Sequence, residues 1–198
     1  MSRRSKKSLK IAIKNVILQS FLKNAMDINN QETINFIKSA ILFCRVIEQS
    51  ADDTSKDFAK KLAGSLAGLY AATVDLPSYD EEDYDYIDLE CKVTEAMYNS
   101  VIQIVSDKLG AHDDFLTVDH VDMQYSDTPI VAHVSEDIAD IYQDIVDMTH
   151  RIQSADNAIM CAALKECVDH FHDFWGQCLT RSLGALHSYI SAPDEEED

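Results

Sequence analysis

The residues best suited to chemistry lie between positions 122 and 147, in the stretch DMQYSDTPIVAHVSEDIADIYQDIVD. Its second half, SEDIADIYQDIVD, carries five carboxylates within thirteen residues. Carboxylates spaced in this way can hold a divalent metal ion, attract a cationic partner, or form the water-facing side of a helix. The choice depends on the direction in which the side chains point from the element that carries them.

A helical reading of residues 135–152 separates apolar from acidic side chains. With about 100° of turn per residue, one side holds Ile138, Ile141, Tyr142, Ile145 and Met148. The opposite side holds the acidic stripe, which is Glu136, Asp140, Asp144 and Asp147, with Asp137 at its margin. Helical metalloenzymes instead point their carboxylates inward from facing helices. The pattern therefore predicts a helix capped by Ser135 with a solvated acidic face, and it predicts neither a metal site nor a cofactor.

The acidic stripe also has a cost that a partner could offset. Acidic side chains three or four residues apart on a helix repel each other by a few tenths of a kcal/mol per pair. A cationic protein partner would relieve that repulsion. We therefore also regard Glu136, Asp140 and Asp144 as a candidate binding surface for such a partner.

A second candidate surface lies just before this helix. No helical or strand period holds from residue 111 to residue 134, so we expect one long irregular connection there, unless part of it forms a short helix. Long connections in compact domains are often functional. Asp122, Tyr125 and Asp127 are therefore candidate binding residues.

Other motifs with chemical meaning are absent. His170 and His172 are two residues apart and point in nearly opposite directions on a helix, so they cannot share a metal ion. The chain has no nucleophile elbow, no P-loop and no dinucleotide fingerprint. Its five cysteines show no CxxC spacing and stand in apolar surroundings, which is typical of buried free thiols in a cytoplasmic protein.

The composition favours an all-α fold. The chain has 198 residues, of which 46% are hydrophobic and 26% charged, with only five Gly and three Pro for turns. Helical periodicity recurs along it, with Thr54 as an N-cap and Gly110 as a C-terminal glycine. A row of small residues, Ala59 to Ala71 with Gly64 and Gly68 beside it, predicts close approach of a neighbouring helix. We expect a single-domain bundle of about six to seven helices, in which Gly176 or Gly184 divides the last long tract.

Charge divides the chain into three regions. Residues 1–25 hold seven Lys or Arg and no acid, as in an organellar presequence or a membrane-surface helix, but their apolar residues form no single stripe. We expect them to be an extension upstream of a true start at Met26, followed by a helical domain at 26–192 and an acidic tail at 193–198. From residue 27 onward ten basic side chains face thirty-five acidic ones, a net charge of −25. Such a body repels phosphate backbones, so we expect no nucleic-acid binding, and no segment is long enough to predict membrane insertion.

At DMQYSDTPIVAHVSEDIADIYQDIVD and FWGQCLTRSLGALH the chain resembles the bacterial family called domain of unknown function 5063, typical of the Bacteroides group. The resemblance covers residues 28 to about 190 and includes Trp175 and His187, which we add to the candidate surface. The family often has Arg at the position of Gly184, so no role for that Arg carries over. The resemblance implies no activity.

Three functions remain open after these arguments. The first is a cytoplasmic interaction or regulatory module that acts through its acidic surface and residues 111–134. The second is a metal-dependent hydrolase of the helical nucleotide-pyrophosphatase kind, which would need a second acidic helix facing the first. The third is an immunity-type inhibitor whose negative face mimics nucleic acid.

Overall fold

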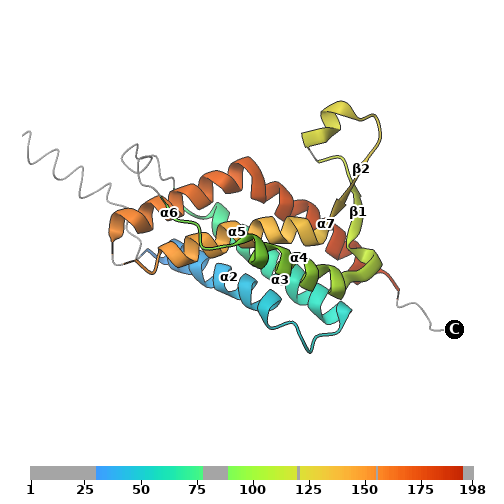
Figure 1. Ribbon diagram of the computed structural model, residues 1–198, viewed down its shortest axis with the longest axis horizontal. Helices are drawn as coiled ribbons and strands as arrows, with labels where there is room; N and C mark the ends of the chain where they lie inside the picture. The colour runs from blue at the N-terminus through green and yellow to red at the C-terminus, as the bar shows by residue number, and fades with distance from the viewer. Residues whose placement is uncertain (1–29, 78–88, 120, 155, 194–198) are drawn as a thin grey trace, which may run out of the picture.

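The computed structural model describes residues 30–77, 89–119, 121–154 and 156–193, so the basic extension and nearly all of the acidic tail lie outside the described residues. Within these ranges the chain forms a helical bundle with one small antiparallel sheet, which confirms the predicted all-α class (Figure 1). The α-helices are α2 (Gln31–Glu48), α3 (Ser55–Val74), α4 (Glu95–Leu109), α5 (Val134–Arg151), α6 (Asn157–His170) and α7 (Gly176–Ser191). The remaining elements are the 3₁₀ helices η2 (Gly110–His112) and η3 (Val121–Tyr125), the π-helix η4 (Phe171–Trp175), and the strands β1 (Asp114–Thr117) and β2 (Ile130–His133).

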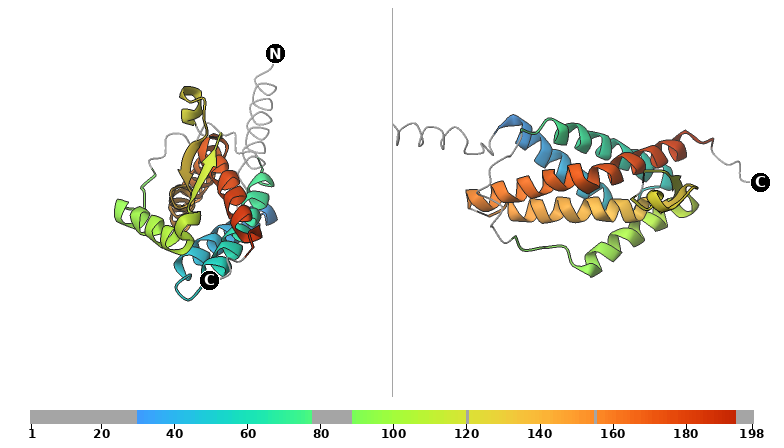
Figure 2. Two further views of the ribbon diagram at one scale, coloured as in Figure 1. Left: turned by 90° about the vertical axis from the view of Figure 1, so that its right-hand side faces the viewer. Right: turned by 90° about the horizontal axis from the view of Figure 1, so that it is seen from above.

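Helix α5 is the centre of the bundle, in contact with α2, α4, α6 and α7 (Figure 2). The predicted apolar side of this helix is buried, since Ile138, Ile141 and Ile145 are fully inaccessible to solvent. They belong to one hydrophobic core cluster with large side chains from the other helices and η4, chiefly Phe36, Phe43, Phe58, Leu62, Leu66, Leu69 and Trp175. No helix within the described ranges has both the length and the apolar character needed to cross a membrane.

The helix ends follow the predicted capping chemistry at two places. The side chain of Thr54 accepts a hydrogen bond from the backbone N–H of Asp57 at the start of α3. Gly110 ends α4 with φ of 56°, a conformation that glycine adopts without steric cost.

The row of small residues on α3 packs as predicted only at its start, where Ala59 is fully buried and Ala63 is partly buried against the core. Gly64, Ala67, Gly68 and Ala71 are exposed, and no heavy atom outside the helix lies within 4 Å of where a Cβ at either glycine would stand. The opposite side of α3 carries large apolar residues and faces the core instead. Burying Phe and Leu removes far more apolar area from water than burying Ala and Gly, so the larger side chains determine which side turns inward.

The connection at residues 111–134 is more regular than expected. It forms a two-stranded antiparallel hairpin, in which β1 and β2 pair with Asp114 opposite His133 and Thr117 opposite Ile130. The 3₁₀ helix η3 lies between the strands, in agreement with the alternative of a short helix. In Figure 1 the hairpin projects away from one end of the bundle.

The last helical tract is divided at Gly176, one of the two predicted positions. There the π-helix η4 joins α6 to α7, and the Trp175 Nε1 donates a hydrogen bond of 2.9 Å to the carbonyl of Cys167. A Cβ at Gly176 would overlap the Phe171 carbonyl oxygen, so the extra residue of the π-turn requires glycine. Gly184 lies inside α7 with open space around it.

Candidate functional site

The hairpin is anchored to the bundle through Asp113. Its carboxylate accepts hydrogen bonds of 2.7 Å from both the backbone N–H and the hydroxyl of Ser135, and its carbonyl accepts one of 2.9 Å from the N–H of Val134. The prediction that Ser135 caps α5 was therefore wrong, because Ser135 lies inside the first turn of α5 and Asp113, the residue just before β1, accepts the hydrogen bonds of that turn. The base of the hairpin and the start of α5 consequently form one rigid corner.

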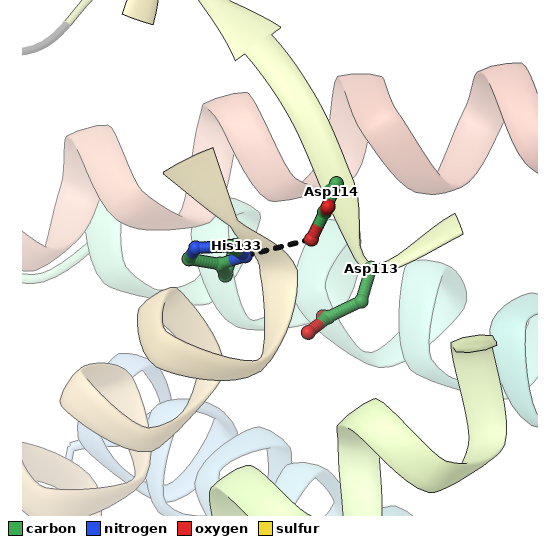
Figure 3. A group of neighbouring side chains, drawn as sticks. All are labelled: Asp113, Asp114 and His133. Carbon is green, nitrogen blue, oxygen red and sulfur yellow. Dashed lines mark hydrogen bonds and ion pairs between the residues drawn. The ribbon is translucent and has the colours of Figure 1, made fainter. Parts of the chain in front are cut away.

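The outer face of the hairpin combines an apolar pair with an ion pair. Leu116 and Val131 lie directly opposite each other, and their exposed fractions are 69% and 54%. Next to them the carboxylate of Asp114 lies 2.8 Å from the Nδ1 of His133 (Figure 3). On the inner face Thr117 and Ala132 are buried.

Two further large side chains extend this surface. Val118 is 60% exposed directly after β1, and Tyr125 is 82% exposed at the end of η3. Together with Leu116 and Val131 they form what we call the hairpin surface. Large apolar side chains gathered on an exposed projecting element are a feature of interaction sites.

A groove of about 660 Å³ runs between the hairpin and α7. At one end the His112 ring stacks on Tyr189 with 4.1 Å between ring centroids, and the Lys56 ammonium lies 4.8 Å from the centroid of the same tyrosine. The remaining lining comes from β1 and the residues after it and from α7, namely residues 114–119, Thr180, Arg181, Gly184, Ala185, Ser188 and Ala192. A groove of this size is within the range of ligand-binding pockets.

Arg181 lies in the wall of the groove, but its charge is neutralised by Asp137 of α5. Its Nε donates to Asp137 at 2.8 Å, its Nη2 donates to the other oxygen of the same carboxylate, and the Ser182 hydroxyl donates to Asp137 at 3.1 Å. This bidentate ion pair is nearly inaccessible to solvent, since only 11% of the Arg181 side chain and 4% of the Asp137 side chain are exposed. The hydrogen bond to Asp137 raises the pKa of Arg181. A third hydrogen bond, of 3.0 Å, ties Arg181 to the carbonyl of Asp119 and so fastens the hairpin to α7.

The acidic stripe does not lie on open solvent as a whole. Asp147 is buried and accepts hydrogen bonds of 2.6 and 2.8 Å from the backbone N–H groups of Lys92 and Val93. Asp140 and Asp144 are half-buried, and only Glu136 is exposed. The prediction of a fully solvated face was therefore wrong for Asp147 and incomplete for Asp140 and Asp144.

Each half-buried carboxylate of the stripe has a partner on another helix. The Tyr98 hydroxyl of α4 donates to Asp140 at 2.7 Å, and the His170 Nδ1 of α6 lies 2.8 Å from Asp144. Burial raises the pKa of both carboxyl groups, although these two hydrogen bonds act against it. The stripe thus lies along the contacts of α5 with its neighbours, where a helical wheel alone cannot place it.

We expect the protein to lose stability as the pH rises from about 6 to about 8.5. The hydrogen bond to Asp144 raises the pKa of His170, and in His133 the Asp114 hydrogen bond and nearby carboxylates raise the pKa against the opposing effect of burial. The two histidines therefore keep their protons in the folded protein at pH values where they have lost them in the unfolded chain, in which the pKa of histidine is about 6.5. This stabilisation is complete below that pH and is lost as the pH rises through the folded-state pKa values. The raised pKa values of Asp140 and Asp144 act in the same direction in more acidic solution.

The measurement for this prediction is the melting temperature across that pH range. The variant His170→Gln should show a smaller decline, because it removes one of the two histidines. A melting temperature that is constant or increases toward pH 8.5 would contradict the role given to the two pairs.

The other predicted site residues are dispersed. Trp175 is fully buried and packs in the core. The prediction that it belongs to the candidate binding surface was therefore wrong. His187 is exposed on α7, and Asp127 is exposed before β2, near Tyr125 in sequence. Asp122 lies in η3, but its side chain is outside the described part of the structure.

The cysteines offer no reactive nucleophile in the core. Cys44, Cys161, Cys167 and Cys178 are buried, as predicted. Burial raises the pKa of Cys44 and of Cys178 to about 12, which keeps both thiols protonated. Cys91 is exposed, contrary to expectation, because it lies in the extended segment before α4.

Two clusters in the described ranges have donor atoms close enough together to share a metal ion, namely Asp113–Asp114–His133 and Asp137–Asp140–Cys178. In each cluster the most deeply buried carboxylate already has other partners, Ser135 for Asp113 and Arg181 for Asp137. We therefore expect Mg²⁺, Mn²⁺ or Zn²⁺ at about 1 mM to change the melting temperature by less than about 1 °C, since stabilisation grows only as RT ln(1 + [L]/Kd). A saturable increase of several degrees, lost in Asp137→Asn, would instead support the metal-dependent hydrolase.

Sequence reasoning missed three features of this site. Arg181 is the single Lys or Arg after residue 165, and a lone cation within an apolar helix indicates a paired charge, so this signal was present. The hairpin lacks a short turn motif such as Asn-Gly, because twelve residues separate its strands. The hydrogen bond by which Asp113 caps α5 joins residues twenty-two positions apart, so no local sequence pattern indicates it.

Comparison with known proteins agrees with the described fold. A family model described as a domain of unknown function, family 5063, matches residues 27–192. The crystal structure of protein BF1032 from Bacteroides fragilis is similar, with a TM-score of 0.73 and 27% sequence identity over 85% of this chain and 98% of that chain. The comparison with curated proteins found no match. The family match spans most of the chain, so the protein belongs to the domain of unknown function 5063 family.

Proposed function

We propose that the protein is an interaction module that binds a cationic protein partner at the hairpin end of the bundle. The observation that carries the proposal is the hairpin surface, in which four large side chains remain exposed on a projecting element beside a groove of about 660 Å³. Within the described part of the chain, neither Leu116 nor Val131 belongs to the core cluster or to the partly buried residues packed against it. Contact with a partner would remove this apolar area from water.

The charge of this half of the chain favours a cationic partner. Residues 110–192 contain fourteen Asp or Glu and three Lys or Arg, a net charge of −11. All three cations are already paired, Arg151 with Glu166, Lys165 with Asp169 and Arg181 with Asp137. A partner that carries Lys or Arg would meet a complementary field, which increases the rate and the specificity of association.

The other two functions need a continuous row of free carboxylates on α5. The carboxylates of Asp137, Asp144 and Asp147 are instead engaged by Arg181, His170 and the backbone of residues 92–93. This engagement favours the interaction module over the hydrolase and over a nucleic-acid mimic. The buried cysteines Cys44, Cys167 and Cys178, which form no disulfide, fit our proposal that the module acts in the cytoplasm.

Site-specific photo-crosslinking in the native cells tests this proposal. A benzophenone amino acid replaces Tyr125 on the hairpin, and a matched control replaces Leu42, which is 55% exposed on α2 away from the hairpin. We expect one protein to crosslink from position 125 and not from position 42. The purified partner should then bind the intact protein with an affinity that falls as salt is added. Identical products from both positions, or none from position 125, would remove the proposal.

A further inference from the structure

The hairpin has an open edge that faces the groove. The sheet contains only β1 and β2 within the described residues, so one edge of β1 has no strand beside it. The six consecutive residues 114–119 all line the groove, although their side chains alternate between the two faces, and no residue of β2 lines it. The groove therefore follows β1 lengthwise, on the side away from β2, with α7 as its other wall.

Open edges of this kind pair readily with an extended segment of another chain. Unpaired N–H and C=O groups along the edge bond to the backbone of the segment, and flanking pockets take alternate side chains. Natural sheets protect exposed edges with Pro or Lys. Positions 114–119 of this chain contain neither residue, and Leu116 and Val118 are exposed there.

The chemistry of the groove specifies the occupant. Asp114, 2.8 Å from the His133 Nδ1, and Asp119 are exposed at the two ends of the lining stretch, and the charge of Arg181 beside them is neutralised by Asp137. Leu116 and Val118 supply apolar contact between the acidic ends.

We propose that the partner segment adds to the open edge of β1 as a third strand, and that the face it shares with Leu116 carries β-branched apolar residues in the middle and Lys or Arg at the two ends. Its cations lie near Asp114 and Asp119, and its apolar side chains pack on Leu116 and Val118. This inference rests on the proposed function, because it specifies how the cationic partner binds.

The probe for the test is the synthetic heptapeptide KTVTVTK, whose Lys and Val side chains share one face of an extended strand, titrated into the full chain at about 150 mM salt and followed by fluorescence anisotropy. Two derivatives carry N-methyl groups on either the odd or the even residues. Strand addition uses the N–H groups of only one edge of the peptide, so we expect one derivative to lose at least about tenfold in affinity and the other to retain binding. Equal affinities of the two derivatives would contradict pairing at an edge.

Two protein variants provide the matched comparison. Leu116→Lys and Val131→Lys add the same charge on the same face of the hairpin, but only Leu116 lines the groove. We expect at least a tenfold loss of peptide affinity in Leu116→Lys and less than a threefold loss in Val131→Lys. Equal losses would show that the peptide responds only to charge or binds the sheet face, and would overturn the inference.

The two proposals can fail separately. If position 125 crosslinks a partner but KTVTVTK does not bind along β1, the interaction module stands and strand addition is wrong. If the peptide binds along β1 but position 125 yields no partner, the open edge remains a peptide-binding site and the proposed function is wrong.

Discussion

Replacing Arg181 with methionine is expected to lower the free energy of unfolding by about 3 to 5 kcal/mol. The reason is that the Asp137 carboxylate, of which only 4% is exposed, would be left charged and buried with only uncharged groups, the Ser182 hydroxyl and the Cys178 thiol, to hydrogen-bond it. Removing one member of a buried ion pair costs far more than the pair itself contributes, because the remaining charge has lost its solvation. Chemical denaturation followed through Trp175, the single tryptophan of the chain, measures the effect.

Two controls isolate this charge effect. The double variant Arg181→Met with Asp137→Leu should recover most of the lost stability, since no charge remains buried. Lys61→Ala breaks an ion pair of similar length, 2.6 Å to Asp53, but Lys61 is 55% exposed, so the cost should be below about 1 kcal/mol. A loss below about 1 kcal/mol in Arg181→Met would mean that the pair is solvated and does not secure α7 to α5.

Replacing Gly176 with alanine is expected to destabilise the protein by about 1 to 3 kcal/mol, the range for an overpacked core. The new Cβ would overlap the Phe171 carbonyl oxygen, and it would stand 3.0 Å from Cε2 of the same residue. Because a carbonyl oxygen is part of the backbone, relief requires a change in the π-turn itself. That change would disturb Trp175, whose ring packs 4.7 Å from the Phe171 ring, so its fluorescence should shift as stability falls.

Gly184→Ala is the matched control for this prediction. Gly184 lies in the same helix with no atom within 4 Å of its missing Cβ, so alanine should stabilise the protein by up to about 1 kcal/mol through helix propensity. Opposite signs for the two substitutions support the steric account. If both substitutions stabilise the protein, glycine is not required by the π-turn.

The helical part of the fold could be predicted from sequence because its signals are local. Helix periodicity, the Thr54 cap and the Gly110 terminus all depend on residues within one or two turns of each other. The hairpin could not be predicted in this way, because its strands have four residues each and are held by the distant contacts Asp113–Ser135 and Arg181–Asp119. The orientation of α3 was mispredicted because the pattern of small residues does not show which side the larger residues occupy.

Some residues of the candidate site could be predicted from the sequence, but their tertiary partners could not. Tyr125 and Asp127 were identified from the length of their connection, and both are exposed. The acidic stripe was recognised as lying opposite the apolar side of its helix. Its partners, Tyr98 and His170, come from helices distant in sequence, so their hydrogen bonds to Asp140 and Asp144 depend on tertiary packing that one helix cannot reveal.

The most direct test of the central claim is the affinity of the crosslinked partner for the variant Leu116→Lys with Tyr125→Ser. Both side chains are exposed, so the free energy of unfolding should stay within about 1 kcal/mol of the unsubstituted protein, the sum expected for two independent surface changes. If the hairpin surface is the binding site, the dissociation constant should increase at least tenfold, because contacts at the centre of an interface carry most of its binding energy. A dissociation constant unchanged in this folded variant would contradict the account and place the partner elsewhere on the bundle.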